Sequence, residues 1–493
     1  MRKLISPAEM LRCGRAYFEY LGIPSIDFME SAAIALFGNI LTHYIHAQTI
    51  YFACGPGGNG GDGYACARLA QEAGMTVRIF ETCAPKSADA IENRQRAIEA
   101  GIPFGGDELP EPDVWVDCLF GTGLSREPDE KAAELISRMN HSGAKVVSAD
   151  IPSGLNGKTG RKYRHCVKAD LTVTFELEKY GHYLQDGPDM CGKIEVAKIG
   201  FGCGAFPENL PGLFTPEDMR RYMAPRQRNI HKGDCGHLLI VAGSLGMAGA
   251  AVLCTKAALR SGVGLVTVAC PESIVPILQM SAPCAMCIPL PEENGAISRE
   301  AVPVLKEAFL GKRAVAVGPG LSRRAAPEAI QAVLESGLPA VIDADALNII
   351  AGNPDLKALL GSGHILTPHP GEAARLLDRK CESPVDDALL LAESGATVVL
   401  KGASRVISDG AKTYISTRGS SAMARGGSGD VLTGMLGATL ARGFDCTRLR
   451  AVAEVCEIHG LCGEAAAEKY GTISANAADL IEMLPEVYKK YAP

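Results

Sequence analysis

The sequence has few aromatic residues, no surplus of positive charge and no long apolar run. Of its 493 residues only 5% are aromatic, and the net charge is −7. A mildly acidic chain attracts neither nucleic acid nor a membrane surface, so we expect neither as a partner. No apolar stretch approaches membrane-spanning length, and the N-terminus lacks the apolar core of a secretory signal. We therefore expect a cytoplasmic protein that acts on small molecules.

The cysteines lack the spacing of a metal site. There are 17, and most lie in apolar runs, as Cys54, Cys118 and Cys254 do, where a thiol behaves as a small buried hydrophobe. Cys284 and Cys287 form a C-x-x-C pair, but no second pair lies nearby to complete a zinc site. We expect a structural role for that pair and reduced thiols, as in the cytoplasm.

Short apolar strands alternate with helical segments along most of the chain, which predicts parallel sheets covered by helices. The Ser-Pro-Ala-Glu run at 6–9 predicts a capped helix start before the first strand. A linker composition at 206–212 separates two such series. The fold class is therefore α/β with two domains, 1–212 and 213–493. In the first series we expect strands at 49–54, 75–80, 114–119, 145–149, 171–175 and 194–199 and helices at 63–72, 88–100 and 129–140. The second begins with a strand at 238–242 and a helix at 249–261 and continues with strands near 265–269, 314–317, 340–342, 365–366 and 397–400, with helices between them.

A glycine-rich loop at 55–63 follows the first of these strands and opens a helix. Gly55, Gly57 and Gly60 satisfy G-x-G-x-x-G, and Glu81 stands about 20 residues on, as in the dinucleotide fingerprint. A tight turn is the simpler alternative. The polar residues within the loop, however, suit a cation or polar substrate groups better than a pyrophosphate.

Two further strand ends carry carboxylates to the same rim. Asp117 precedes the loop 120–124, and Asp150 precedes Ile-Pro-Ser-Gly at 151–154. Either carboxylate could simply cap the next helix. Ligands bind outside the carboxyl ends of strands in such sheets, so we expect the three loops to form one site.

These three loops resemble the N-terminal domain of NAD(P)H-hydrate epimerases, a family with a Rossmann-like three-layer αβα sandwich that interconverts the R and S forms of hydrated NADH and NADPH. The resemblance implies a potassium ion held by Asn59, Asp117 and Ser153, and Asp150 as the residue that transfers a proton near C6 of the ring. The family loop has two asparagines where this chain has Gly58 and Asn59. The implied hydrate contacts are Gly58, Asn59, Gly60, Gly61, Asp62, Gly121, Thr122, Gly123, Leu124, Ser125, Arg126, Glu127 and Asp150.

A second glycine run, 426–429, precedes Asp430 and an apolar helical stretch. Bare N–H groups at a helix start attract an anion, and an aspartate beside them could take a proton from an attacking hydroxyl, so the run suggests phosphoryl transfer to an alcohol. A flexible turn before a buried helix is the simpler alternative. The second domain contains no Walker A motif, because no G-K-[ST] closes its glycine loops.

Other loops of the second domain also end strands. His369, between prolines, and Lys401, before a glycine, could be a structural histidine and a solvated lysine, but their positions favour contact with ligand. With the glycine run, these loops resemble the ribokinase-like NAD(P)H-hydrate dehydratases, which use ADP or ATP, with Mg²⁺, to dehydrate S-NAD(P)H hydrate. The resemblance implies Asp430 as base, hydrate contacts at Ala250, Gly320, His369 and Asp430, and nucleotide contacts at Lys401, Gly402, Ala403, Ser404, Arg405, Gly427, Ser428 and Gly429.

The two resemblances together cover nearly the whole chain and imply a bifunctional repair enzyme for hydrated nicotinamide nucleotides. The alternative is a ribokinase-like vitamin-precursor kinase fused to a Rossmann-like domain that only binds. We also expect a homo-oligomer whose partners are NADH or NADPH hydrate and ADP or ATP.

Overall fold

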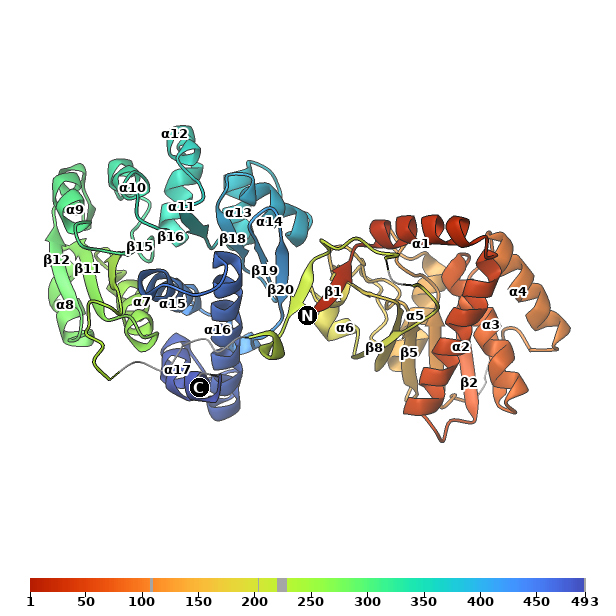
Figure 1. The fold of residues 1–493 in the computed structure, drawn as a ribbon. Coiled ribbons are helices and arrows are strands. Elements are labelled where there is room, and N and C mark those ends of the chain that lie inside the picture. Colours follow the sequence, from red (N-terminus) through yellow and green to blue (C-terminus); the bar gives the residue numbers. More distant parts are fainter. Residues whose placement is uncertain (107–109, 203, 220–227, 492–493) are drawn as a thin grey trace. The chain divides into compact units, whose positions relative to one another are not determined.

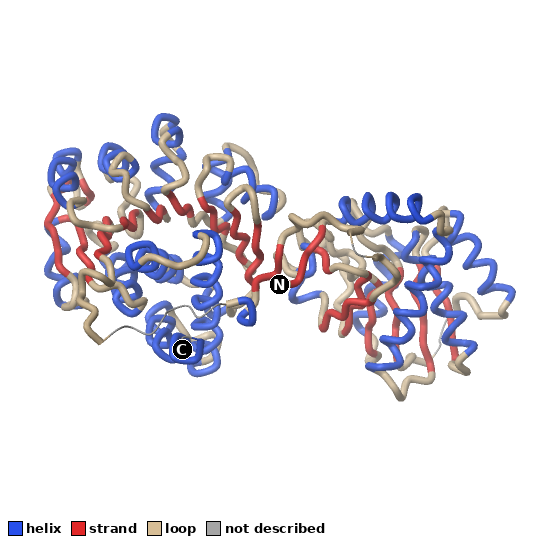
Figure 2. The backbone as a smooth tube through the Cα atoms, viewed as in Figure 1, coloured by secondary structure: helices blue, strands red, loops and turns tan. Residues whose placement is uncertain are grey.

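The computed structural model describes residues 1–106, 110–202, 204–219 and 228–491. The chain separates into two compact units, which we describe one at a time. The N-terminal unit is Lys3–Leu210, and the C-terminal unit is Pro211–Pro493 together with Met1–Arg2. In both units, strands lie between helices (Figures 1 and 2), which confirms the predicted α/β fold class.

The N-terminal unit is built on a sheet with the strand order β3-β2-β4-β5-β6-β8, in which every pair of neighbours is parallel. A short parallel pairing of β1 with β7 lies outside this sheet. The elements in chain order are β1 (Arg2–Ile5), α1 (Pro7–Leu21), α2 (Ser25–His43), β2 (Thr49–Cys54), α3 (Gly58–Glu72), β3 (Thr76–Glu81), α4 (Ala88–Glu99), β4 (Val114–Cys118), α5 (Glu130–His141), β5 (Lys145–Ala149), β6 (Leu171–Phe175), β7 (Glu178–Lys179), α6 (Gly187–Met190) and β8 (Lys193–Ala197).

Successive side chains of the central strands enter two different cores. On β2, Phe52 packs in the core beneath α2, α3 and α4, whereas Tyr51 packs in the core beneath α5. On β4, Val116 and Trp115 divide in the same way. Because side chains alternate across a strand, an almost uninterrupted apolar run is what a sheet covered on both faces requires.

The start of α1 has the predicted capping box. The Ser6 hydroxyl accepts the Glu9 N–H at 3.3 Å, and the Glu9 carboxylate accepts the Ser6 N–H at 3.3 Å. Two N–H groups at the helix start that have no partner within the helix are thereby satisfied. The prediction of a helix beginning at Pro7 is confirmed.

The start of α3 differs from the prediction: the helix begins at Gly58, not at residue 63. The predicted loop is therefore largely the first turns of the helix. A Cβ on Gly60 would lie 1.9 Å from the Gly55 carbonyl oxygen, and one on Gly63 would lie 2.8 Å from the Cys54 sulfur. These glycines let the helix backbone pack directly on the strand ends, a role that sequence reasoning had given to ligand binding.

The C-terminal unit has a larger sheet, in which the strands follow the order β12-β11-β10-β15-β16-β17-β18-β19-β20-β9. Its neighbours are parallel except β18 with β19 and β19 with β20. The sequence did not predict β9, β12, β19 and β20. The elements are β9 (Gly212–Phe214), β10 (His237–Val241), α7 (Ala248–Arg260), β11 (Leu265–Pro271), α8 (Val275–Ser281), β12 (Met286–Leu290), β13 (Glu292–Glu293), β14 (Ala296–Ile297), α9 (Val302–Ala308), β15 (Ala314–Val317), α10 (Pro327–Leu334), β16 (Ala340–Ile342), α11 (Ala344–Ala351), α12 (Pro354–Ala358), β17 (His364–Leu366), α13 (Pro370–Leu377), α14 (Pro384–Ala392), β18 (Thr397–Leu400), β19 (Arg405–Ser408), β20 (Thr413–Ser416), α15 (Ser428–Arg442), α16 (Arg448–Tyr470) and α17 (Ala477–Tyr491).

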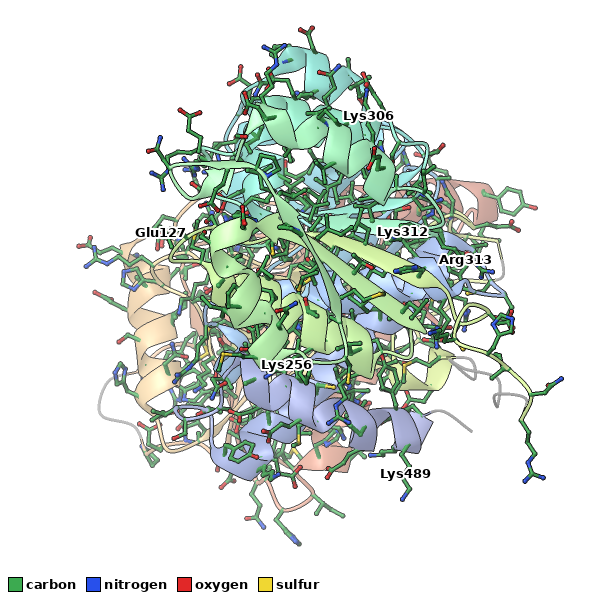
Figure 3. All side chains as sticks on the ribbon, turned by 90° about the vertical axis from the view of Figure 1, so that its left-hand side faces the viewer. Glu127, Lys256, Lys306, Lys312, Arg313 and Lys489 are labelled. Atoms are coloured by element: carbon green, nitrogen blue, oxygen red, sulfur yellow. The ribbon has the colours of Figure 1, made fainter. Side chains whose placement is uncertain are left out.

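Helices cover both faces of this sheet. In Figure 1, α9 to α14 lie on one face, and α7, α15, α16 and α17 lie on the other. Lys306 of α9 and Lys256 and Lys489 of α7 and α17, all exposed, mark the outer surfaces of the two layers in Figure 3. Helix α15, by contrast, is buried around most of its circumference, and a Cβ on Gly434 would lie 2.1 Å from the Cys254 carbonyl of α7. Since α15 begins with Ser428, the second glycine run stands at the start of this helix, where Gly426 is exposed and Ser428 is buried.

Within the described residues, no single helix is long and apolar enough to cross a membrane. The bent pair α1 and α2 together reaches the required length and apolar composition, and these two criteria are all that it meets.

Candidate active sites

The N-terminal unit has a pocket of about 530 Å³ at the ends of β2, β4 and β5. The three loops expected to converge therefore do meet. Of the predicted contacts, the pocket is lined by Gly58, Asn59, Asp62, Gly121, Thr122, Gly123, Leu124, Ser125, Arg126 and Asp150. It is also lined by Leu11, Pro56, Gly57, Leu119, Phe120 and Phe175, which sequence reasoning did not assign.

Three predicted contacts do not line the pocket. Gly60 and Gly61 are buried in α3, where a Cβ would meet the Gly55 carbonyl and the Met29 sulfur respectively. Glu127 accepts the backbone N–H groups of Arg164 at 3.1 Å and His165 at 3.0 Å. Gly60 and Gly61 therefore serve the packing of α3, and Glu127 fixes the backbone at 164–165.

Asp150 directs one carboxylate oxygen toward protein donors. Its Oδ1 accepts from the Thr174 hydroxyl at 3.0 Å, from the Phe175 N–H at 3.3 Å and from the Lys179 ammonium. The backbone of Asp150 has a positive φ of 65°, which is rare for a residue with a side chain. Because Oδ1 is saturated, Oδ2 is the atom left to act on a ligand in the pocket.

Lys179 determines the charge of Asp150. The side chain of Lys179 is fully buried, and its ammonium also donates to the Thr174 hydroxyl at 2.8 Å. Burial by itself would raise the pKa of Asp150, but the Lys179 ammonium, together with His182 and the Phe175 N–H, outweighs burial and lowers that pKa below its ordinary value. The Nε2–H of His182 donates to the Asp150 carbonyl at 3.0 Å, and burial, with the charge of Lys179, lowers the pKa of His182 to about 4. Asp150 is thus an anion beside a neutral imidazole.

Asp62 lines the same pocket, but its pKa shifts in the opposite direction from that of Asp150. Burial, together with repulsion from Asp150, raises the pKa of Asp62 well above its ordinary value. When the environments of two carboxylates in one site separate their pKa values, one is suited to donate a proton and the other to accept it.

Asp117 is a fully buried carboxylate held entirely by neutral donors. It accepts from the Ser148 hydroxyl at 2.8 Å, from the Ser153 N–H at 2.8 Å and hydroxyl at 2.5 Å, and from the Leu119 N–H at 3.2 Å. Among the described residues no cationic side chain pairs with it, and burial raises its pKa. Asn59 lines the pocket, whereas Asp117 and Ser153 are not among its lining residues, and the buried Nδ2 of Asn59 has no hydrogen-bond partner in the described part of the chain.

Glu81 does not act as the dinucleotide fingerprint requires. Its carboxylate accepts from the Tyr64 hydroxyl at 2.6 Å and from the Arg94 guanidinium at 2.6 Å. Both partners belong to the protein, so the Glu81 oxygens are engaged in a structural ion pair. The position of Glu81 at the end of β3 therefore serves a contact within the protein.

In the C-terminal unit, Asp430 lies in the first turn of α15, where the preceding Gly427 has a φ of 100°. Burial, together with repulsion from Asp343, raises the pKa of Asp430 to about 7, against an opposing attraction from Lys401. A general base is most effective when its pKa lies near the working pH. A Cβ on Gly429 would lie 3.4 Å from the Lys401 Nζ, so the glycine run passes directly over this lysine.

Asp343 organises the polar groups beneath Asp430. One of its oxygens accepts from the Lys401 ammonium at 2.7 Å, and the other accepts from the Thr433 hydroxyl at 2.7 Å. The Lys401 ammonium also lies 3.9 Å from the Glu372 carboxylate. Lys401 is therefore held by two carboxylates in a fixed position at the foot of the glycine run.

His369 is the N-cap of α13. Its Nδ1 accepts the Gly371 N–H at 2.9 Å, and its Nε2 lies 3.4 Å from the Glu372 carboxylate. Its side chain is nonetheless 51% exposed and thus accessible to a ligand. Gly320 lies beside the other predicted hydrate contact, because a Cβ on it would lie 2.9 Å from the Ala250 Cβ.

The segment 401–405 divides into two parts. Gly402 and Ala403 are exposed, whereas Ser404 and Arg405 are buried. The Arg405 guanidinium donates to the Arg418 carbonyl at 2.7 Å, so its side chain points into the protein. In the glycine run, Ser428 is buried, and its hydroxyl has no hydrogen-bond partner among the described residues.

Sequence reasoning assigned no role to four residues around the two aspartates: Lys179 and Thr174 donate to Asp150, and Asp343, which accepts from Thr433, raises the pKa of Asp430. Asp343 could have been recognised from the sequence, because it directly follows a buried strand, as Asp150 does. Lys179 had a weaker signal in the sequence, since it lies four positions after Phe175, the last residue of the buried strand β6.

Comparison with known families gives two matches. Residues 238–486 match the model described as NAD(P)H-hydrate dehydratase, and residues 25–181 match the model described as YjeF-related protein N-terminus. The two matched segments lie in the C-terminal and the N-terminal unit, respectively.

Individual relatives match over nearly the whole chain. The bifunctional NAD(P)H-hydrate repair enzyme Nnr of Moorella thermoacetica is 36% identical, with 99% of this chain and 96% of the relative covered. The protein of the same name from Escherichia coli K12 is 34% identical, with 97% and 93% covered. Among solved structures, the ADP/ATP-dependent NAD(P)H-hydrate dehydratase of Bacillus subtilis, co-crystallised with ATP and Mg²⁺, is 28% identical, covers 58% of this chain and 100% of its own, and has a TM-score of 0.48.

Proposed function

Because the chain belongs to the family of bifunctional NAD(P)H-hydrate repair enzymes, we propose that it interconverts R- and S-NAD(P)H hydrate in its N-terminal unit and dehydrates the S form in its C-terminal unit, at the expense of ADP or ATP. The arrangement that supports this proposal best is Asp430 with its pKa near neutrality, one residue beyond a glycine run that opens a buried helix. The other unit supplies the epimer that the dehydratase accepts.

In the dehydratase, Asp430 takes the proton from the C6 hydroxyl of the hydrate, and the oxygen attacks the terminal phosphorus of the nucleotide. The bond from that phosphorus to the bridging oxygen breaks, so AMP leaves from ADP, or ADP from ATP. The N–H groups of Gly427, Ser428 and Gly429 face the charge that develops on the phosphoryl oxygens. The C6–O bond then breaks, phosphate leaves with the electron pair, and a proton leaves the neighbouring carbon, which restores the ring double bond. Phosphorylation is needed because hydroxide is a poor leaving group.

Around this centre we assign the remaining contacts by position. Ala250, Gly320 and His369 face the hydrate, and the exposed residues Gly402 and Ala403, beside Lys401, face the nucleotide. No cluster of three or more His, Cys, Asp or Glu side chains in the described part of the chain could hold a metal ion. The residues present therefore fit Mg²⁺ that arrives with the nucleotide and takes most of its ligands from phosphate and water.

In the epimerase, the ionised Asp150 transfers a proton near C6 of the ring through its free Oδ2. Asp62, on the same pocket wall and protonated, donates to the hydroxyl or ring of the hydrate. Residues 121–126 also line the pocket. The pocket thus combines one proton donor and one acceptor, which is the minimum that an epimerisation through protonation and deprotonation requires.

We assign the potassium ion to Asn59, Asp117 and Ser153. All three offer oxygen atoms, which are the ligands that hard cations prefer. A fully buried carboxylate such as Asp117 is costly without a positive partner, and a cation would compensate its charge. Bound potassium would supply a positive charge at the edge of the pocket that orients the polar groups of the nucleotide.

The direct test is an assay of the whole chain with hydrated NADH. With ADP or ATP and Mg²⁺, absorbance at 340 nm should recover; without nucleotide, pure R-hydrate should convert to a mixture of epimers on chiral chromatography. If a vitamin-precursor alcohol is phosphorylated and the hydrate is not dehydrated, the C-terminal unit is a vitamin kinase. If R-hydrate does not epimerise faster than in buffer, the N-terminal unit only binds.

A further inference from the structure

A buried histidine with both ring nitrogens engaged lies behind the glycine run of the C-terminal unit. His459, on α16, is 3% exposed. Its Nε2 lies 3.0 Å from the Ser428 carbonyl oxygen, and its Nδ1 lies 3.1 Å from the Arg405 guanidinium. The three residues come from α15, α16 and β19, so the contacts join three separate elements.

The partners of His459 determine where its proton lies. A guanidinium has only donors, so Nδ1 must be the acceptor and carry no proton. A carbonyl has only acceptors, so Nε2 must carry the proton and donate it to Ser428. Burial, and then the charge of Arg405, lower the pKa of His459 well below its ordinary value, so the ring stays neutral. One tautomer of the neutral imidazole alone satisfies both contacts.

The hydrogen bond from His459 to the Ser428 carbonyl also orients the next N–H group, that of Gly429. The peptide is planar and trans, so its C=O and N–H point in opposite directions. The bond from His459 to the Ser428 oxygen therefore fixes the direction of the Gly429 N–H. As a first-turn group of α15, that N–H has no carbonyl within the helix to bond and is left for a ligand. It belongs to the residue that passes over the Lys401 ammonium.

Small residues let α16 come close enough for this contact. A Cβ on Gly460, next to His459, would lie 2.4 Å from the Arg418 carbonyl oxygen, and one on Gly463 would lie 2.1 Å from the Met423 sulfur. Arg405 donates to the same Arg418 carbonyl at 2.7 Å. Helix α16 and the segment before the glycine run are thus fixed against each other at the point where His459 reaches Ser428.

We propose that His459 is a positioning residue for phosphoryl transfer, which holds the Ser428–Gly429 peptide so that the Gly429 N–H faces the transferred phosphoryl group, with Arg405 fixing the tautomer. The inference rests on the dehydratase function proposed above. His459 itself touches neither the hydrate nor the nucleotide.

Two amide variants separate the contacts of His459. In His459→Asn the side-chain oxygen can still accept from Arg405, but its amide is too short to reach Ser428. In His459→Gln the amide nitrogen extends to the position of Nε2 and can donate to Ser428 again. We expect kcat for dehydration to fall at least tenfold in H459N and to stay within about threefold of wild type in H459Q, with KM for ADP changed less than kcat, because an N–H that meets the phosphoryl group in the transition state affects the chemical step most.

Folding of the variants is checked by ADP binding in calorimetry and by thermal unfolding of the whole chain, since epimerisation reports only on the other unit. Equal kcat values in wild type and H459N, or an H459Q that is folded and no better than H459N, would overturn the proposal. A wild-type chain with no dehydratase activity would instead overturn the proposed function.

A spectroscopic readout tests the tautomer independently of activity. In ¹⁵N-histidine spectra of the whole chain, assigned by comparison with H459Q, His459 should show a protonated Nε2 and an unprotonated Nδ1 and should not titrate between pH 8 and pH 5.5. Arg405→Met should abolish that preference. An imidazolium, or a proton on Nδ1 in the wild type, would contradict the assignment even if the variants lost activity.

Discussion

The two units use the same side chain in opposite electrostatic settings. Asp150 has a buried ammonium of its own, that of Lys179, and its pKa is lowered in spite of burial. Asp430 has no such partner among the described residues: the nearby Lys401 is bound to Asp343, and the pKa of Asp430 is raised to about 7. Both carboxylates start from the same solution pKa, so the difference between their pKa values in the protein depends on whether a lysine pairs with the carboxylate itself. The chain thus keeps one aspartate as a permanent anion and makes the other a base that works near neutrality.

The largest expected effect comes from removing each carboxylate in turn. Asp430→Asn should lower dehydration by about 10²- to 10⁴-fold, the usual contribution of a general base, and leave epimerisation unchanged. Asp150→Asn should do the reverse, and each variant is the matched control for the other. Both rates are measured on the whole chain with the same hydrate preparation. Loss of both activities in either folded variant would contradict the separation of the two sites.

The stability of Asp430→Asn distinguishes lost catalysis from lost folding. A carboxyl whose folded pKa is raised destabilises the protein increasingly as pH rises from its unfolded pKa, near 4, to its folded pKa, near 7, and by a constant amount above that. The variant should therefore be more stable than wild type, by about 4 kcal/mol at pH 8 and by progressively less toward pH 4. Urea unfolding at several pH values checks this. A variant that is less stable at pH 8 would show that Asp430 supports the fold.

Exchange of the lysine that pairs with Asp150 should abolish the difference in pKa between Asp150 and Asp430. Lys179→Met leaves a buried carboxylate without its partner, which costs roughly 3–5 kcal/mol in comparable pairs. In the variant the pKa of Asp150 should rise, and an acidic limb should appear in the pH profile of epimerisation. Lys401→Met is the counterpart in the other unit and should shift the limb of the dehydratase to higher pH. A folded K179M with an unchanged, flat profile would show that Lys179 does not set the charge of Asp150.

These residues show which features of the fold and of the two sites can be predicted from the sequence alone. The Ser6–Glu9 capping box and the strand ends at Asp117 and Asp150 were predictable, because caps and strand ends depend on local pattern. Lys179 was not, since its partner lies 29 positions earlier in the chain and only the tertiary fold brings the two together. The same holds for His459, which is buried on a helix whose own pattern marks it as an ordinary core position. The resemblance to known families supplied the site residues, and the structure supplies what sets their charge.

Wild-type pH profiles compare the two units without any substitution. Dehydration, measured as kcat/KM, should fall about tenfold per pH unit below pH 7, because Asp430 must be ionised to act. Epimerisation should show no such limb between pH 8 and pH 5, because the pKa of Asp150 is below its ordinary value. The uncatalysed epimerisation of the hydrate is subtracted at each pH. A dehydratase profile that stays level to pH 5 would rule out Asp430 as the titrating base.

The smallest expected effect is at Thr174, whose hydroxyl links the two members of the buried pair. It donates to Asp150 and accepts from Lys179, so Thr174→Val removes one of three donors from Oδ1 at nearly constant volume. A hydrogen bond to a charged group contributes about 1.5–3 kcal/mol, but the ammonium remains, so we expect epimerisation to fall by less than tenfold and the pKa of Asp150 to rise slightly. Thr172→Val is the matched control: it lies on the same strand and loses a bond to the Cys191 carbonyl, with no contact to Asp150 among its described hydrogen bonds. If both variants change epimerisation equally, the effect belongs to the strand and not to the charge of Asp150.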